Sequence, residues 1–113
     1  METYSKRQEK VSKLLQRDLA DIFQKEAPLF KSALITVTKV RVSPDLSYAK
    51  VFLSIFIPNG DTNEIMEAIQ AQTNNFRYLL GKRIKHQVKK IPELRFFIDD
   101  SLDYIENIDK LLH

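Results

Sequence analysis

Residues 74–101 limit the fold most strongly, because they join an amphipathic helix to a short strand through a proline. Apolar side chains recur at helical spacing on one face, at Phe76, Leu79, Leu80, Ile84 and Val88. Pro92 lacks an amide hydrogen and disfavours helical backbone at the residue before it, so the helix is predicted to end near Lys90. The next residues alternate with the period of a strand, which places three apolar side chains on one face: Leu94, Phe96 and Ile98.

The preceding segments supply a helix, two strands and the start of a second helix. A capping-box spacing between Ser5 and Gln8 begins a predicted helix over 5–26, and Pro28 stops it. Residues 33–42 and 47–57 are rich in β-branched and aromatic side chains, which predicts two strands. The Ser43-Pro44-Asp45 turn between them favours an antiparallel hairpin. Another predicted helix begins at Asp61, three residues before Glu64.

A break separates this second helix from the basic helix of residues 74–90. The sequence Gln72-Thr73-Asn74-Asn75 contains weak helix formers. Asparagine is the residue next best to glycine in a left-handed backbone position, so the kink is expected at Asn74 or Asn75. Residues 99–113 form an acidic exit from the last strand, and Ser101 is predicted to cap a short C-terminal helix there.

The predicted order is helix, strand, strand, helix, kink, helix, strand, followed by the short C-terminal helix. Helices gathered on one face of a small, largely antiparallel sheet make an α+β fold. The chain has 113 residues, which predicts one domain over residues 1–113. Phe96 and Phe97 are both interpreted as core residues. The last strand must pair with one of the first two, and either direction of pairing agrees with the sequence.

Composition excludes several classes of function. The chain has no cysteine, so disulfides and thiolate metal sites are excluded. No apolar stretch approaches the ~20 residues that span a bilayer, and the N-terminus lacks an apolar signal core, so we expect a cytoplasmic protein with no membrane partner. The sequence contains no His-x-x-x-His pair, phosphate-binding glycine loop or activated nucleophile motif. We therefore expect no enzyme activity, metal, cofactor or small-molecule substrate.

Basic residues are concentrated in two places. Residues 77–95 hold seven Lys or Arg and one acid, a net charge of +6 in a chain whose total is +3. The first helix holds four further cations whose spacing of four, three and four residues places them on one ridge: Lys6, Lys10, Lys13 and Arg17. Glu9 and Asp18 are expected to project elsewhere on the helix, so the ridge is predicted to contain no acidic residue. Such a surface attracts phosphates, and the predicted RNA-binding residues are Lys6, Arg7, Lys10, Lys13, Arg17, Tyr78, Lys82, Arg83, Lys85, Lys89 and Lys90. The alternative interpretation is an ordinary solvated helix surface.

Three stretches together resemble the ribosome-binding factor A family. They are VSPDLSYAKVFLSIF at Val42 to Phe56, FRYLLGKRI at Phe76 to Ile84, and IPELRFFIDDSLDY at Ile91 to Tyr104. The resemblance covers roughly Val11 to Tyr104. It implies a type II KH-like domain and a non-catalytic factor that binds the small ribosomal subunit and its rRNA during late maturation of that rRNA, here taken to act as a monomer.

One feature departs from the family pattern, and one alternative function stays open. The family usually has an Ala-x-Gly kink where this chain has Gln72-Thr73-Asn74. The only glycines are Gly60 and Gly81, so the Gly-x-x-Gly backbone clamp of ordinary KH domains is absent. The alternative function is a protein–protein interaction module that uses an exposed strand edge and the amphipathic C-terminal segment.

Overall fold

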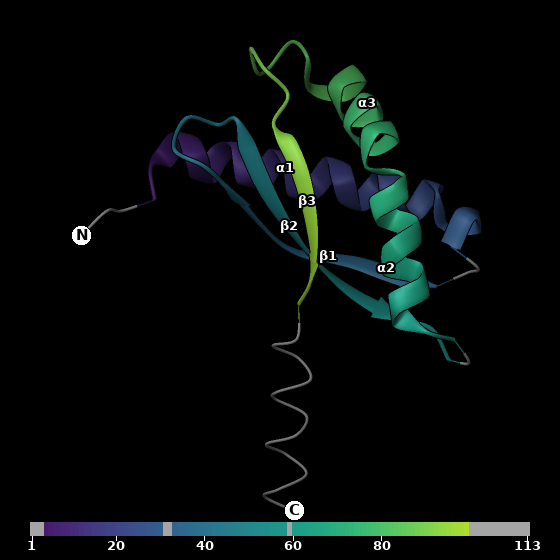
Figure 1. Ribbon diagram of the computed structural model, residues 1–113. Helices are drawn as coiled ribbons and strands as arrows, with labels where there is room; N and C mark the ends of the chain where they lie inside the picture. Colours follow the sequence, from purple (N-terminus) through teal and green to yellow (C-terminus); the bar gives the residue numbers. More distant parts are fainter. Residues whose placement is uncertain (1–3, 31–32, 59, 100–113) are drawn as a thin grey trace, which may run out of the picture.

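The computed structural model describes residues 4–30, 33–58 and 60–99, and within them the predicted α+β order is confirmed (Figure 1). The elements in chain order are α1 (Lys6–Lys25), η1 (Ala27–Phe30), β1 (Leu34–Val42), β2 (Tyr48–Phe56), α2 (Thr62–Ala71), α3 (Thr73–Ile84) and β3 (Glu93–Ile98). The predicted C-terminal helix and most of the acidic exit lie outside the described residues.

The start of α1 is fixed by the predicted capping box. The Ser5 side chain accepts a hydrogen bond from the Gln8 amide, and the Gln8 side chain accepts one from the Ser5 amide. Gln8 also donates from Nε2 to the Val42 carbonyl oxygen at 3.0 Å, so the cap attaches α1 to the end of β1. The apolar stripe of α1 is buried against the sheet and α3, and it consists of Val11, Leu15, Leu19, Ile22 and Phe23.

The sheet has the strand order β1-β2-β3. β1 pairs with β2 in antiparallel fashion, with a bulge between Val37 and Lys39, and β3 pairs with β2 in parallel fashion. In Figure 1, α1 passes behind the strands, and α2 and α3 lie beside them. A parallel pairing needs a long crossover connection, and α2 and α3 provide it.

Aromatic side chains hold the layers together. Phe23, Phe30, Phe76 and Phe96 come from four different elements, and their ring centroids lie 4.5 to 6.3 Å apart in the contacting pairs. All four are buried. The expectation that Phe97 is also core is wrong, because its side chain is 39% exposed on the side of the sheet away from the helices. Ile98 is equally exposed, so the inward alternation of β3 ends at Phe96.

The β1–β2 turn is built around one carboxylate and one left-handed residue. Asp45 accepts hydrogen bonds from the hydroxyls of Ser43 and Ser47, which lower the pKa of its carboxyl group to about 2. Leu46 has a φ of 60°, an uncommon value for a bulky residue, and its side chain packs against the core. The predicted turn is therefore confirmed, with a conformation that its composition did not specify.

The break between the two central helices is confirmed, but its predicted position is wrong. It lies at Gln72, whose φ is −100° and ψ is 11°, and Asn74 and Asn75 lie in the first turn of α3. The Gln72 amide hydrogen-bonds to the carbonyl oxygens of Gln70 and Ile69, so a tight turn closes α2. Leu46 is the only non-glycine residue with positive φ among the described residues, so no left-handed asparagine is needed.

The basic helix is also shorter than predicted. α3 ends at Ile84, and residues 85–92 form a turn and a loop that return the chain to the sheet. The amides of Gln87 and Val88 bond to the Ile84 carbonyl oxygen, and the Glu93 amide bonds to the Ser47 carbonyl oxygen where β3 begins. Val88 packs on the core from this loop. Val88 is therefore apolar because it packs on the core from the loop, and not because it continues the apolar face of α3.

The revised break predicts the effect of substitutions at Asn74. Because Asn74 is helical and exposed, Asn74→Ala should preserve or raise stability, and Asn74→Gly should be less stable than Asn74→Ala by up to ~1 kcal/mol. Urea denaturation of the three proteins measures this order. If the glycine variant were the most stable, a left-handed kink at Asn74 would be restored as the explanation.

Candidate nucleic-acid interface

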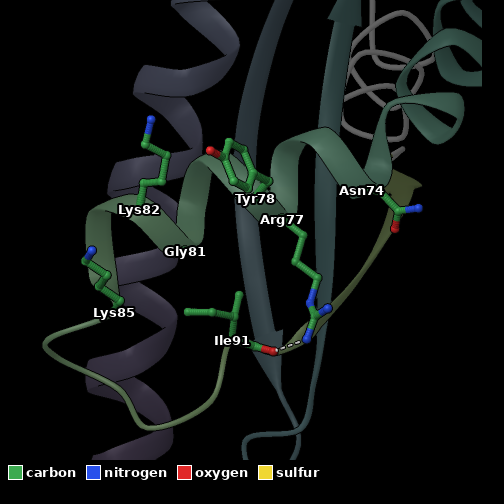
Figure 2. Close-up of a pocket in the computed structure, with 7 residues that line it drawn as sticks. All are labelled: Asn74, Arg77, Tyr78, Gly81, Lys82, Lys85 and Ile91. Atoms are coloured by element: carbon green, nitrogen blue, oxygen red, sulfur yellow. Dashed lines mark hydrogen bonds between the residues drawn. The ribbon is translucent and has the colours of Figure 1, made fainter.

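A groove runs between α3 and the loop that precedes β3 (Figure 2). Its volume is about 520 Å³, and its lining residues are Asn74, Arg77, Tyr78, Gly81, Lys82, Lys85 and Ile91. The Tyr78 side chain is 64% exposed, and Lys82 Nζ lies 5.5 Å from the centroid of its ring. The groove therefore combines three cationic side chains with one accessible aromatic face.

Arg77 fixes the far wall of this groove. Its Nη2 donates to the Ile91 carbonyl oxygen at 2.8 Å, and its Nε donates to the Pro92 carbonyl oxygen at 3.2 Å. Figure 2 shows the arginine reaching from α3 to the loop. We did not predict Arg77 as a site residue, because its contact joins residues that are distant in sequence. The sequence offers one indication of a role for Arg77 in the site, which is its position next to Tyr78 in the basic segment.

Gly81 lets the loop lie close to α3. A Cβ atom at this position would meet Ile91 Cγ1 at 3.4 Å, which is at the tight limit of ordinary contact. A small residue here leaves the middle of the groove open between Tyr78 and Lys85.

A second groove joins the start of α1 to the loop after α3. Arg7 and Lys10 from α1 line a cavity of about 480 Å³ together with Lys89, and Lys90 lines an adjoining cavity with Arg7. Lys85, Lys89 and Lys90 are predicted on the basic helix. Instead, Lys85 begins the turn that follows α3, and Lys89 and Lys90 lie in the loop after that turn. The fold thus brings together cations from the two predicted basic regions.

Arg83 has a structural contact that the sequence prediction missed. Its guanidinium lies 2.7 Å from Asp21 Oδ2 and 3.7 Å from Asp18 Oδ1, which ties α3 to α1. Hydrogen bonds from Arg83 and Lys25 hold the pKa of the Asp21 carboxyl group below its usual value. The assignment of Arg83 to RNA binding is therefore weakened, because its charge is already balanced within the protein.

The predicted ridge without acids on α1 is wrong. Lys13 Nζ lies 3.4 Å from Glu9, and Arg17 Nη2 lies 3.6 Å from Asp18. Glu9 stands four residues before Lys13, the spacing at which helical side chains meet, and the long Arg17 side chain reaches its neighbour. Lys6, Arg7 and Lys10 are exposed, and none of them forms an ion pair within the described part of the chain.

The chemistry that these surfaces offer is charge and stacking. Within residues 4–30, 33–58 and 60–99, no three His, Cys, Asp or Glu side chains are grouped to hold a metal ion. None of the helices in the same residues has the length and apolar character needed to cross a bilayer. Lysines around an exposed tyrosine can contact phosphates and stack against a base.

Comparison with known proteins links this arrangement to one family. The family model for ribosome-binding factor A matches residues 7–112. Ribosome-binding factor A of Cytophaga hutchinsonii is 47% identical over 109 residues, which cover 96% of this chain and 81% of that protein.

Two solved structures with this family name are also similar. The crystal structure of Thermus thermophilus ribosome-binding factor A has a TM-score of 0.67 and 25% identity, and the match covers 80% of this chain and 94% of that one. A homology model of the Thermus thermophilus factor, fitted into a cryo-EM map of its 30S complex, has a TM-score of 0.61 and 26% identity. That match covers 77% of this chain and 89% of the other.

The ion pair between Arg83 and Asp21 predicts a pH effect. A carboxyl group whose folded pKa is lowered stabilises the fold above its unfolded pKa of ~3.9, and this contribution disappears as pH falls through the folded pKa. In the Arg83→Gln variant, the pKa of Asp21 should rise toward its usual value, and the stability difference from wild type should shrink below about pH 4. NMR titration of the Asp21 carboxyl carbon and acid unfolding of both proteins measure this. An unchanged pKa of Asp21 would show that Arg83 is not its main partner.

Proposed function

This chain belongs to the ribosome-binding factor A family, and we propose that it binds the small ribosomal subunit and its rRNA during late maturation of that rRNA. The observation that carries the proposal is the family match over residues 7–112. The Thermus thermophilus factor has been fitted into the map of a 30S complex, which supports the small subunit as the partner. We further propose that the protein acts in the cytoplasm as a monomer and without catalysis.

We infer that residues 1–113 form one type II KH-like domain. The order helix, strand, strand, helix, helix, strand and the parallel pairing of β2 with β3 support this inference. The chain has glycines only at positions 60 and 81, so the usual Gly-x-x-Gly clamp on a nucleic-acid backbone is absent. The groove beside α3 supplies side-chain cations in its place.

We propose that this groove binds rRNA through Tyr78, Lys82 and Lys85. Lys82 and Lys85 are exposed, and neither forms an ion pair within the described segments. Attraction between these ammonium groups and phosphates supplies affinity without sequence preference. The wall held by Arg77 and the exposed ring of Tyr78 give the groove a fixed shape, which suits recognition of folded RNA.

We propose that the second groove also contacts rRNA and adds to the binding by the groove beside α3. Arg7 and Lys10 line it with Lys89, and Lys90 adjoins it. Lys6 lies one residue before Arg7 on the exposed start of α1. Lys13, Arg17 and Arg83 are expected to contribute less, because each already lies beside a carboxylate.

The proposal predicts different effects for two double variants with the same change in charge. Lys82→Gln with Lys85→Gln should weaken binding to small subunits and reduce the dependence of log affinity on log salt by up to ~0.7–0.9 for each phosphate whose neutralisation is removed. Lys13→Gln with Arg17→Gln is the matched control and should have a smaller effect. Sedimentation with purified small subunits at several salt concentrations measures both.

Stability should change little in either variant, because exposed substitutions usually shift it by less than ~0.5 kcal/mol. Equal salt dependence in wild type and the Lys82/Lys85 variant would remove the α3 groove from the binding surface. A shallow salt dependence for all three proteins would favour the alternative of a protein–protein interaction module.

A further inference from the structure

The face of the sheet opposite the helices carries a second set of basic and aromatic side chains. Strand residues alternate, so Ala49, Val51, Leu94 and Phe96 are buried toward the helices and their neighbours point the other way. Lys39, Lys50 and Arg95 are exposed on this face, so no element of the described residues covers its middle. The side chains on it include Lys39, Arg41, Tyr48, Lys50, Phe52, Arg95 and Phe97.

Three cations form one row across the three strands. Arg41 is paired in register with Lys50, and Lys50 is paired in register with Arg95. Like charges that lie directly opposite each other destabilise a sheet. None of the three forms an ion pair with residues 4–30, 33–58 or 60–99. Arg41 and Arg95 lie over the rings of Tyr4 and Tyr48, which offsets part of the repulsion within the row, and an anionic ligand would offset more of it.

Acidic groups on this face stand at its ends. Glu93 begins β3 and is paired in register with Tyr48. Asp99 follows β3 and accepts a hydrogen bond from Thr38 Oγ1 at 2.5 Å. The middle of the face, from Lys39 to Arg95, is therefore cationic.

Aromatic rings lie between these cations. The next row pairs Lys39 with Phe52 and Phe52 with Phe97. The two phenylalanine rings stack with centroids 5.7 Å apart, and Lys39 Nζ lies 4.9 Å from the Phe52 centroid. In the neighbouring row, the Arg95 guanidinium lies 5.1 Å from the centroid of the Tyr48 ring. Phe52 and Tyr48 thus each lie beside a positive charge, Phe97 stacks on Phe52, and part of each ring is open to solvent.

We propose that this sheet face binds a short single-stranded segment of RNA. Unpaired bases stack on exposed aromatic rings while cations contact the phosphates between them. Phe52 and Phe97 are the stacking residues, and Lys39, Arg41, Lys50 and Arg95 are the phosphate contacts. A duplex does not expose its base faces, and an acidic peptide would use the cations without needing the rings.

This inference extends the proposed function and rests on it only in taking RNA as the ligand. The α3 groove lies on the helical side of the molecule, whereas these side chains point away from the helices. One molecule can then hold folded rRNA at the groove and an unpaired strand at the sheet. The two sites are separable by mutation.

The test is binding of a fluorescent single-stranded oligoribonucleotide of eight mixed bases to the full chain. Phe52→Leu with Phe97→Leu removes the rings and keeps apolar side chains, and it should weaken binding at least about fivefold. Lys50→Gln with Arg95→Gln should lower the salt dependence by about 0.7 for each phosphate that is no longer neutralised. The same variant should melt at an equal or higher temperature, because the like-charge row is removed.

The Lys13/Arg17 to Gln variant is the charge-matched control, because each of these cations already lies beside a carboxylate, and its oligonucleotide affinity should stay within about twofold of wild type. Unchanged oligonucleotide binding in both sheet variants would overturn the sheet site, as would equal affinity for a duplex of the same sequence. A poly-glutamate peptide could also displace the oligonucleotide completely, and with equal potency from wild type and from the Phe52/Phe97 variant. That result would assign the face to an acidic protein instead of RNA. Loss of subunit sedimentation in the Lys82/Lys85 variant alone tests the α3 groove, so failure of one site is distinguishable from failure of the other.

Discussion

The packing of four phenylalanines is the interaction on which the rest of the structure depends. Phe23, Phe30, Phe76 and Phe96 join α1, η1, α3 and β3, and the closest pair, Phe23 and Phe76, has ring centroids 4.5 Å apart. Truncating one buried phenylalanine to alanine typically costs ~3–5 kcal/mol, which is a large share of the stability of a domain of this size. This cluster sets the position of α3 over the sheet. It therefore sets where both the groove beside α3 and the open face of the sheet lie.

The cations of this protein divide into three groups once the core is in place. Arg77 and Arg83 hold the fold, through backbone carbonyls of the loop and through carboxylates of α1. Lys13 and Arg17 are balanced locally by acids of their own helix. The third group lacks such partners among the described residues and includes Lys82, Lys85 and the row on the sheet. A count of charge along the chain does not separate these groups, because only the structure shows which cations already have a partner within the protein.

Features encoded within a few residues were predictable from sequence. The capping box of Ser5 and Gln8, the hairpin and the order of elements depend on local spacing, and the structure confirms them. Features that depend on distant contacts were not. The end of α3 at Ile84 follows from the return of the chain to Ser47. The roles of Arg77 and Arg83 follow from partners that are distant in the sequence, at Ile91 and Asp21. The open sheet face was hidden for the same reason, because its rows form only when three strands are in register.

The central claim is that the groove between α3 and residues 85–92 faces rRNA. A cryo-EM reconstruction of this protein on small ribosomal subunits from the same organism tests the claim most directly. We predict that Lys82 and Lys85 lie within hydrogen-bonding distance of phosphate oxygens, with Tyr78 against the RNA. A reconstruction in which this groove faces solvent, or contacts only ribosomal protein, would contradict the account.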